Sequence, residues 1–67
     1  MELIDKALKR VDVRISLDEL LILNNALNEV CHGLDKFEFD TRMGVSQEEV
    51  AKLLQKIGSL IDEVENN

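Results

Sequence analysis

The chain contains no tryptophan, tyrosine or proline, and it has only one cysteine and one histidine. One cysteine excludes an internal disulfide, and one cysteine with one histidine falls short of the ligand set of a structural zinc site. Without proline, nothing in the sequence forces a long helix to break. No apolar run approaches the roughly 18 residues of a membrane-spanning helix. We therefore expect no disulfide, no metal, no other cofactor and no membrane partner.

The chain is short and rich in apolar residues, with 67 residues of which 45% are hydrophobic. That length suits one domain, so we expect residues 1–67 to fold as a single small unit. A domain of about 60 residues buries only about 60% of the surface that its unfolded chain exposes. Such domains usually gain stability from disulfides, a metal or self-association. Because the first two are excluded, we expect a homo-oligomer, most simply a dimer.

Acidic residues outnumber basic ones by fourteen to eight, which gives a net charge of −6. Binding to nucleic acid depends on neutralising phosphates, so an acidic chain is a poor candidate for it. The balance suits a soluble surface or a basic protein partner. The N-terminal sequence MELIDKALKR lacks the basic segment and apolar run of a secretory signal. Together with the lone cysteine, this predicts a cytoplasmic protein.

The N-terminal third contains two different periodicities. In residues 2–10 the apolar side chains recur at helical spacing, at Leu3, Ile4, Ala7 and Leu8. This spacing predicts a short helix. Residues 11–15 alternate instead, with Val11, Val13 and Ile15 on one side, which predicts a short strand. A single strand needs a pairing partner. We consider two possible pairing partners: the same strand of a second copy, or residues 36–40 of the same chain.

A helix is predicted to begin after Ser16, because Ser16 and Glu19 have the spacing of a capping box. We expect it to continue to His32 and to end at Gly33 as the C′ residue. At 100° per residue, one side of this helix forms a predicted core face of Leu20, Leu23, Ala26, Leu27, Val30, Cys31 and Leu34. A second stripe is half apolar and half amide, and we predict that it is an interaction surface: Leu17, Leu21, Asn24, Asn28 and His32.

A second amphipathic helix is predicted over residues 47–64, because Ser46 and Glu49 repeat the capping spacing. Its apolar stripe consists of Val50, Leu53, Leu54, Ile57, Leu60, Ile61 and Val64. Ala51 and Gly58 lie beside that stripe, one heptad apart. Two small residues so placed would let another backbone approach, either within the chain or from a partner, so both are candidate interaction residues.

The connector FEFDTRMG, residues 37–44, contains the only two aromatic residues of the chain. Phe37 and Phe39 are two residues apart, so they would share one face of an extended segment and could pack against Val13 and Ile15. We expect Met43 to fill the end of the helix pair. Arg42 could pair with an acidic neighbour or reach a partner's carboxylate. We include these two aromatics, Arg42 and Met43 among the candidate interaction residues.

No constellation of catalytic residues can be assembled. Cys31 and His32 are adjacent on a helix, so their side chains point about 100° apart and are badly placed for a nucleophile and its base. Glu29 and His32 have the spacing of one half of a di-metal carboxylate site, but the other glutamates of such a site are missing. The three glycines are too far apart to form a phosphate loop. We therefore predict no enzyme activity and no catalytic, cofactor-binding or metal-binding residue.

The segments VDVRISLDELL and GVSQEEVAKLL resemble the ribbon-helix-helix repressors and antitoxins. In that family a short strand leads through a Ser or Thr cap into one helix, and a Gly-x-Ser turn opens a second. The resemblance implies a dimer in which the strands of two chains pair and enter the DNA major groove. Here the strand would present Asp12, Arg14 and Ser16, and the acidic Asp12 would face phosphates. We retain the dimer as an expectation and make DNA binding the weakest alternative.

The predicted fold is mostly α with a minor β part. It consists of a short N-terminal helix, one short strand, and two amphipathic antiparallel helices joined by an aromatic-containing connector. The predicted function is that of a non-enzymatic protein–protein interaction module that self-associates. The alternative is a small acidic inhibitor of a basic protein, of the immunity-protein or antitoxin kind.

Overall fold

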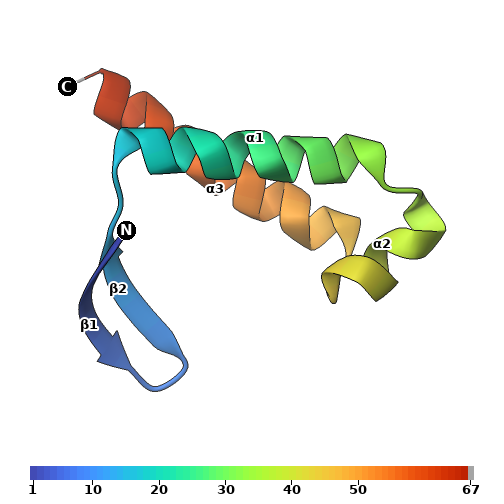
Figure 1. The fold of residues 1–67 in the computed structure, drawn as a ribbon, viewed down its shortest axis with the longest axis horizontal. Helices are drawn as coiled ribbons and strands as arrows, with labels where there is room; N and C mark the ends of the chain where they lie inside the picture. The colour runs from blue at the N-terminus through green and yellow to red at the C-terminus, as the bar shows by residue number, and fades with distance from the viewer. Residues whose placement is uncertain (67) are drawn as a thin grey trace.

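The computed structural model describes residues 1–66 and shows a β-hairpin followed by three helices (Figure 1). The elements in chain order are β1 Glu2–Ala7, β2 Arg10–Arg14, α1 Leu17–Gly33, α2 Lys36–Met43 and α3 Gln47–Glu65. The long helices α1 and α3 run antiparallel against each other, and α2 closes one end of the pair (Figure 1). The prediction of a mostly helical protein is confirmed, and so is that of two packed long helices.

The N-terminal segment is a hairpin, so the predicted helix over residues 2–10 is wrong. β1 pairs antiparallel with β2 through a two-residue loop, Leu8 and Lys9, and Lys9 adopts a left-handed φ of 62°. The register shifts between Leu3 and Asp5, which marks a β-bulge. Both partners considered for the second strand were also wrong, because that partner is β1. Pairing with the neighbouring strand outweighs the helical spacing of the segment.

Helix α1 begins as predicted and ends differently. The Ser16 hydroxyl accepts a hydrogen bond from the Glu19 N–H at 3.1 Å, and the Glu19 carboxylate accepts one from the Ser16 N–H at 3.1 Å. This reciprocal pair is the predicted capping box. Gly33 lies inside the helix and not at a left-handed C′ position. The chain leaves the helix through Leu34 in an extended conformation, with its N–H donating to the Val30 carbonyl at 3.2 Å.

The connector is also helical, which corrects the prediction of an extended aromatic segment. Helix α2 begins after Asp35 and ends at Gly44, which has a φ of 74°. In this left-handed conformation glycine carries no steric cost, and the Gly44 N–H donates to the Asp40 carbonyl at 2.9 Å. Side chains two positions apart on a helix point about 200° apart. Phe37 and Phe39 therefore lie on opposite sides, and neither packs against the hairpin.

Helix α3 confirms its predicted range to within one residue, and the Ser46 hydroxyl accepts the Glu49 N–H at 3.2 Å. The core lies between α1 and α3 in two clusters. One consists of Leu20, Ile57 and Ile61, with Ile15, Leu17, Leu21 and Leu27 packed around it. The other consists of Cys31, Phe39 and Val50, with Leu27, Val30, Leu34, Met43 and Leu54 around it. The second cluster holds α2 in place through Phe39.

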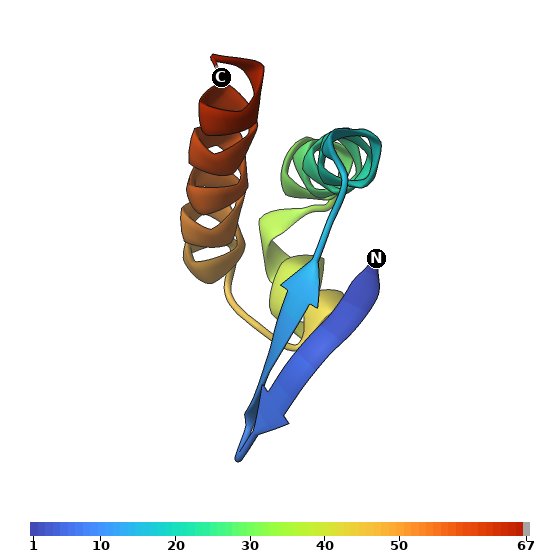
Figure 2. The ribbon, with the colours of Figure 1, turned by 90° about the vertical axis from the view of Figure 1, so that its left-hand side faces the viewer.

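The hairpin stands apart from this core. Every residue of β1 and β2 is exposed. Between the elements of residues 1–66, packing contacts join β1 to β2, α1 to α3 and α2 to α3, so neither strand packs on a helix. A hydrogen-bonded ion pair between the Met1 ammonium and the Glu19 carboxylate connects the start of the hairpin to α1. Figure 2 shows that the hairpin and α2 extend from the same side of the helix pair.

Candidate interaction surfaces

The predicted amide-containing stripe of α1 belongs partly to the core. Leu17 and Leu21 are half-buried against the Leu20 cluster. Asn24 and Asn28 are half-buried as well. His32 is exposed, and its Nδ1 lies 2.8 Å from the backbone carbonyl of Asn28, one turn earlier. Compared with the predicted core face, the side of α1 that packs on α3 is rotated toward this stripe. Little of the stripe is therefore free to contact a partner.

The same rotation exposes residues that were assigned to the core. Leu23 and Ala26 were predicted to face inward, and both are exposed. Ile22, next to them in the sequence, is exposed too. The free apolar surface of α1 thus lies on the edge opposite to the one that the sequence suggested.

The four connector residues separate into two buried and two exposed. Phe39 is completely buried and Met43 is half-buried beside it, so both are core residues. Phe37 is 93% exposed. Arg42 is exposed, and its Nε lies 3.4 Å from the Glu38 carboxylate one turn away. Of the two alternatives considered for Arg42, the pair with an acidic neighbour is present in the single chain, and the helical form of the connector brings the two residues together.

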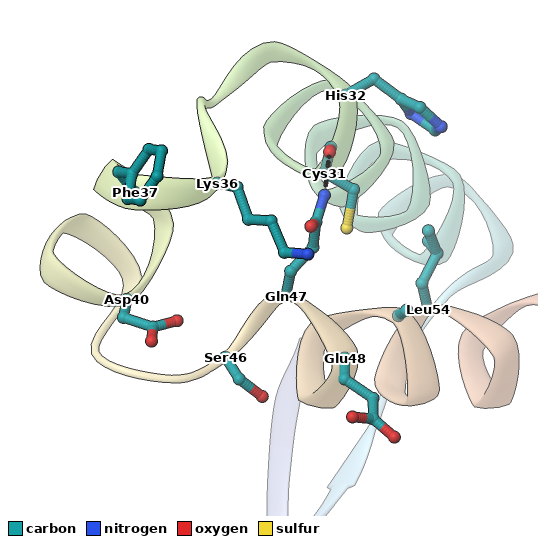
Figure 3. A pocket seen from close by; sticks show the side chains of 10 residues that line it. Cys31, His32, Lys36, Phe37, Asp40, Ser46, Gln47, Glu48 and Leu54 are labelled. Atoms are coloured by element: carbon teal, nitrogen blue, oxygen red, sulfur yellow. Dashed lines mark hydrogen bonds between the residues drawn. The ribbon is translucent and has the colours of Figure 1, made fainter.

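One pocket lies where α1, α2 and α3 meet (Figure 3), with a volume of about 830 Å³. It brings together three of the predicted interaction residues, His32, Phe37 and Ala51. The other lining residues are Cys31, Lys36, Asp40, Ser46, Gln47, Glu48 and Leu54. The Gln47 side-chain amide donates to the Cys31 carbonyl at 2.7 Å, which links the start of α3 to the end of α1.

The chemistry of this pocket is mixed. Lys36, Asp40 and Glu48 place one positive and two negative charges around a partly apolar lining. The Cys31 thiol is buried, while the His32 ring extends away from it toward solvent (Figure 3). Within residues 1–66, no three His, Cys, Asp or Glu side chains are placed to hold a metal ion.

Gly58 was predicted to allow a close approach of another backbone. A β-carbon added at Gly58 would meet no atom within 4 Å, so no segment of residues 1–66 packs closely there. Ala51, one heptad earlier, is exposed at the pocket. The two small residues do not form a packing notch within the described chain.

Two apolar surfaces outside the predicted interaction residues are exposed. The first is the hairpin face, which we define as Leu3, Val11 and Val13, between 39% and 61% exposed. The second is the helix-edge stripe, which we define as Leu23 of α1 and Leu53, Leu60 and Val64 of α3, between 36% and 49% exposed. The signal lay in the apolar patterns themselves: Val11 and Val13 alternate in β2, and Leu53, Leu60 and Val64 form one edge of the α3 stripe.

Charge is distributed unevenly between the hairpin and the helices. Residues 1–14 carry four basic and three acidic side chains, a net of +1. Residues 15–67 carry four basic and eleven acidic side chains, a net of −7. Among the acids, Glu19 has its pKa lowered by the N-terminal ammonium and then by the hydrogen bond from the Ser16 N–H. The helices therefore present an acidic surface and the hairpin a weakly basic one.

No helix within residues 1–66 is long and apolar enough to cross a bilayer. The chain matches no protein family, no curated protein and no solved structure.

Proposed function

We propose that this chain is a non-enzymatic protein–protein interaction module that self-associates, most simply as a homodimer. One observation carries the proposal. Six hydrophobic residues are buried in the described chain, whereas thirteen large hydrophobic residues are exposed. Single exposed apolar residues are ordinary, but contiguous apolar patches on a small protein indicate interaction sites.

The shape of the molecule supports the same conclusion. Its principal extents are 38 × 31 × 15 Å, so it is flat, and its hairpin has no layer behind it. A two-stranded hairpin alone is at best marginally stable in water. A second chain that covers the hairpin would remove apolar surface from water at about 25 cal/mol per Å². Association would thus supply the burial that the monomer lacks.

Sedimentation equilibrium tests this proposal directly. We expect a mass that rises with concentration toward twice the 7.6 kDa of one chain. Unfolding should then depend on concentration, because partner binding stabilises the folded state by mass action. A single 7.6 kDa species at tens of micromolar, with a concentration-independent unfolding midpoint, would refute self-association.

The acidic helices favour a second candidate function, binding of a basic protein as its inhibitor. The net charge of −7 over residues 15–67 is large for so small a surface and would accelerate association with a basic partner. This candidate predicts that a basic protein is retained on the immobilised chain at low salt and released at moderate salt. A matched variant with Glu48→Gln and Glu49→Gln, both exposed at the start of α3, should retain less of it. Equal retention by this variant would argue against charge-driven recognition at this end of α3.

A further inference from the structure

The hairpin is amphipathic, although both of its faces meet water in the single chain. The register pairs Leu3 with Val13 and Lys6 with Val11, and opposed residues share a face. One face is therefore apolar, with the Lys6 side chain at its edge. The other face carries the charged pairs Glu2–Arg14 and Asp5–Asp12. A hairpin with one apolar face is the pattern of a sheet that is covered on that side.

The residues of the helix-edge stripe lie on one side of the helix pair. At 100° per residue, Leu53, Leu60 and Val64 lie about 20–60° to one side of the buried Ile57. On α1, Leu23 lies about 60° to the same side of the buried Leu20. Both helices are right-handed and run antiparallel (Figure 1), so these two edges lie on the same side of the pair.

That side is the one from which the hairpin projects. Val30 is two turns after Leu23 on the same edge of α1, and it packs against the cluster that contains Phe39 of α2. The stripe therefore faces the side on which α2 lies, and Figure 2 shows the hairpin on that side as well. Two copies brought together through this side would each extend a hairpin toward the other copy's stripe.

Charge complementarity selects the helices of a second copy as the surface that covers the hairpin. The hairpin segment has a net charge of +1 and the helical segment one of −7, so the two segments attract each other. Glu49 and Glu63 flank the stripe on α3, with Lys56 between them, and Lys6 lies on the apolar side of the hairpin. Packing hairpin on hairpin would instead join two positive segments and leave the stripe in water.

We infer that the hairpin face of one copy packs on the helix-edge stripe of a second copy, and the reverse, in a two-fold symmetric dimer. This inference rests on the proposed self-association and names its interface. A symmetric dimer of this kind contains the hairpin–stripe contact twice. The solvent-exposed Leu8 at the tip of the hairpin, 90% exposed in the single chain, would lie at the far end of that contact.

Mixing two complementary variants tests the arrangement. Val11→Glu damages the hairpin face, and Leu60→Glu damages the stripe at a half-exposed helix position. Each variant alone should raise the dimer dissociation constant about tenfold or more, because both dimer contacts are damaged. An equimolar mixture should regain association, since a dimer of one chain of each kind keeps one undamaged hairpin–stripe contact. Phe37→Glu, on the fully exposed side of α2, is the matched control and should dimerise as the parent does.

The possible outcomes test the hairpin–stripe interface and the proposed self-association separately. A parent chain that is monomeric refutes self-association itself. A dimeric parent whose association survives Leu60→Glu refutes the stripe as its interface and leaves self-association standing. Two monomeric variants that remain monomeric on mixing refute the hairpin–stripe pairing, since a contact between like surfaces cannot be repaired by mixing.

A cysteine pair gives a second readout if an acidic variant loses its helical circular dichroism. In a Cys31→Ala background, one chain carries Val11→Cys and the other Leu60→Cys. We expect a disulfide-linked species that contains both chains, identified by mass. Linkage of Val11→Cys chains only to each other would mean that hairpins pack on hairpins and would overturn the inference.

Discussion

Replacing Phe39 with alanine should cost more stability than any other single truncation in α2. Phe39 has no exposed surface, and it joins α2 to Cys31 of α1 and Val50 of α3 in one cluster. Truncation of a buried phenylalanine to alanine costs about 3–5 kcal/mol, from lost transfer free energy and from the cavity left behind. At about 0.05–0.15 kcal/mol per residue, a 67-residue chain has a free energy of unfolding of only about 3–10 kcal/mol. Phe39→Ala should therefore leave a large fraction of the protein unfolded at 25 °C.

Phe37→Ala is the matched control, because it makes the same chemical change in the same helix two residues earlier. Phe37 is 93% exposed, so its truncation removes almost no packing. Alanine also has the higher helix propensity, so the variant should be unchanged or more stable by a few tenths of a kcal/mol. Urea unfolding followed by far-UV circular dichroism measures both variants. Equal losses at the two positions would refute the helical geometry of the connector, since an extended segment would bury both rings together.

Four further outcomes follow from particular contacts. Ser16→Ala should lower the free energy of unfolding by about 1 kcal/mol in urea titrations, because it removes the hydroxyl that caps α1. Arg42→Ala should cost less than about 0.5 kcal/mol by the same assay, because its ion pair with Glu38 is exposed. The pKa of Glu19 is lowered in the fold, so its ionised form stabilises the folded state. This stabilisation is complete above the ordinary pKa of 4.5 and is lost as the pH falls through the lower folded-state pKa. In an acid titration, the free energy of unfolding of Glu19→Gln should therefore not show this decrease. Lys9→Gly should stabilise the hairpin by about 1 kcal/mol by relieving the left-handed φ, and cross-strand NOEs between Leu3 and Val13 should strengthen.

The parts of the fold that could be predicted are those with local causes. A serine followed three residues later by glutamate satisfies the first N–H groups of a helix without help from the rest of the chain. Both helix starts, at Ser16 and Ser46, were therefore correctly placed. The buried residues of α3 also followed from its periodicity, because a helix that packs on one neighbour buries one stripe.

The connector was misassigned although its sequence contains helix signals. Asp35 precedes the first turn, Glu38 and Arg42 are spaced to form an i,i+4 pair, and Gly44 is the C-cap residue. The two phenylalanines at alternate positions were given more weight than these signals. On a helix the same spacing buries one ring and exposes the other, so the alternation that favoured a strand in fact separates a core residue from a surface residue.

The rotation of α1 could not be obtained from its sequence, because apolar residues lie on more than half of its circumference. Leu17, Leu21 and Leu23 were all compatible with an inward position. The choice depends on where α3 and Phe39 contact the helix, and neither α3 nor Phe39 belongs to the sequence of α1 itself. Leu17 and Leu21 of the predicted interaction surface therefore pack against the core, and the exposed Ile22 and Leu23 lie on the opposite edge.

The hairpin was not predicted from its sequence for the same physical reason that its apolar face is uncovered. Nothing local favours this hairpin strongly, since its turn places Lys9 in a left-handed conformation and its register sets Asp5 opposite Asp12. Like charges at opposed positions destabilise a strand pair, and the helices of the same chain contribute no packing to the strands. A second copy that covers Leu3, Val11 and Val13, as proposed above, would supply stability that these local interactions lack. Local periodicity misassigns a segment of this kind, because its own sequence favours no single structure strongly, and the proposed dimer predicts that the missing contacts are made at the apolar face of the hairpin.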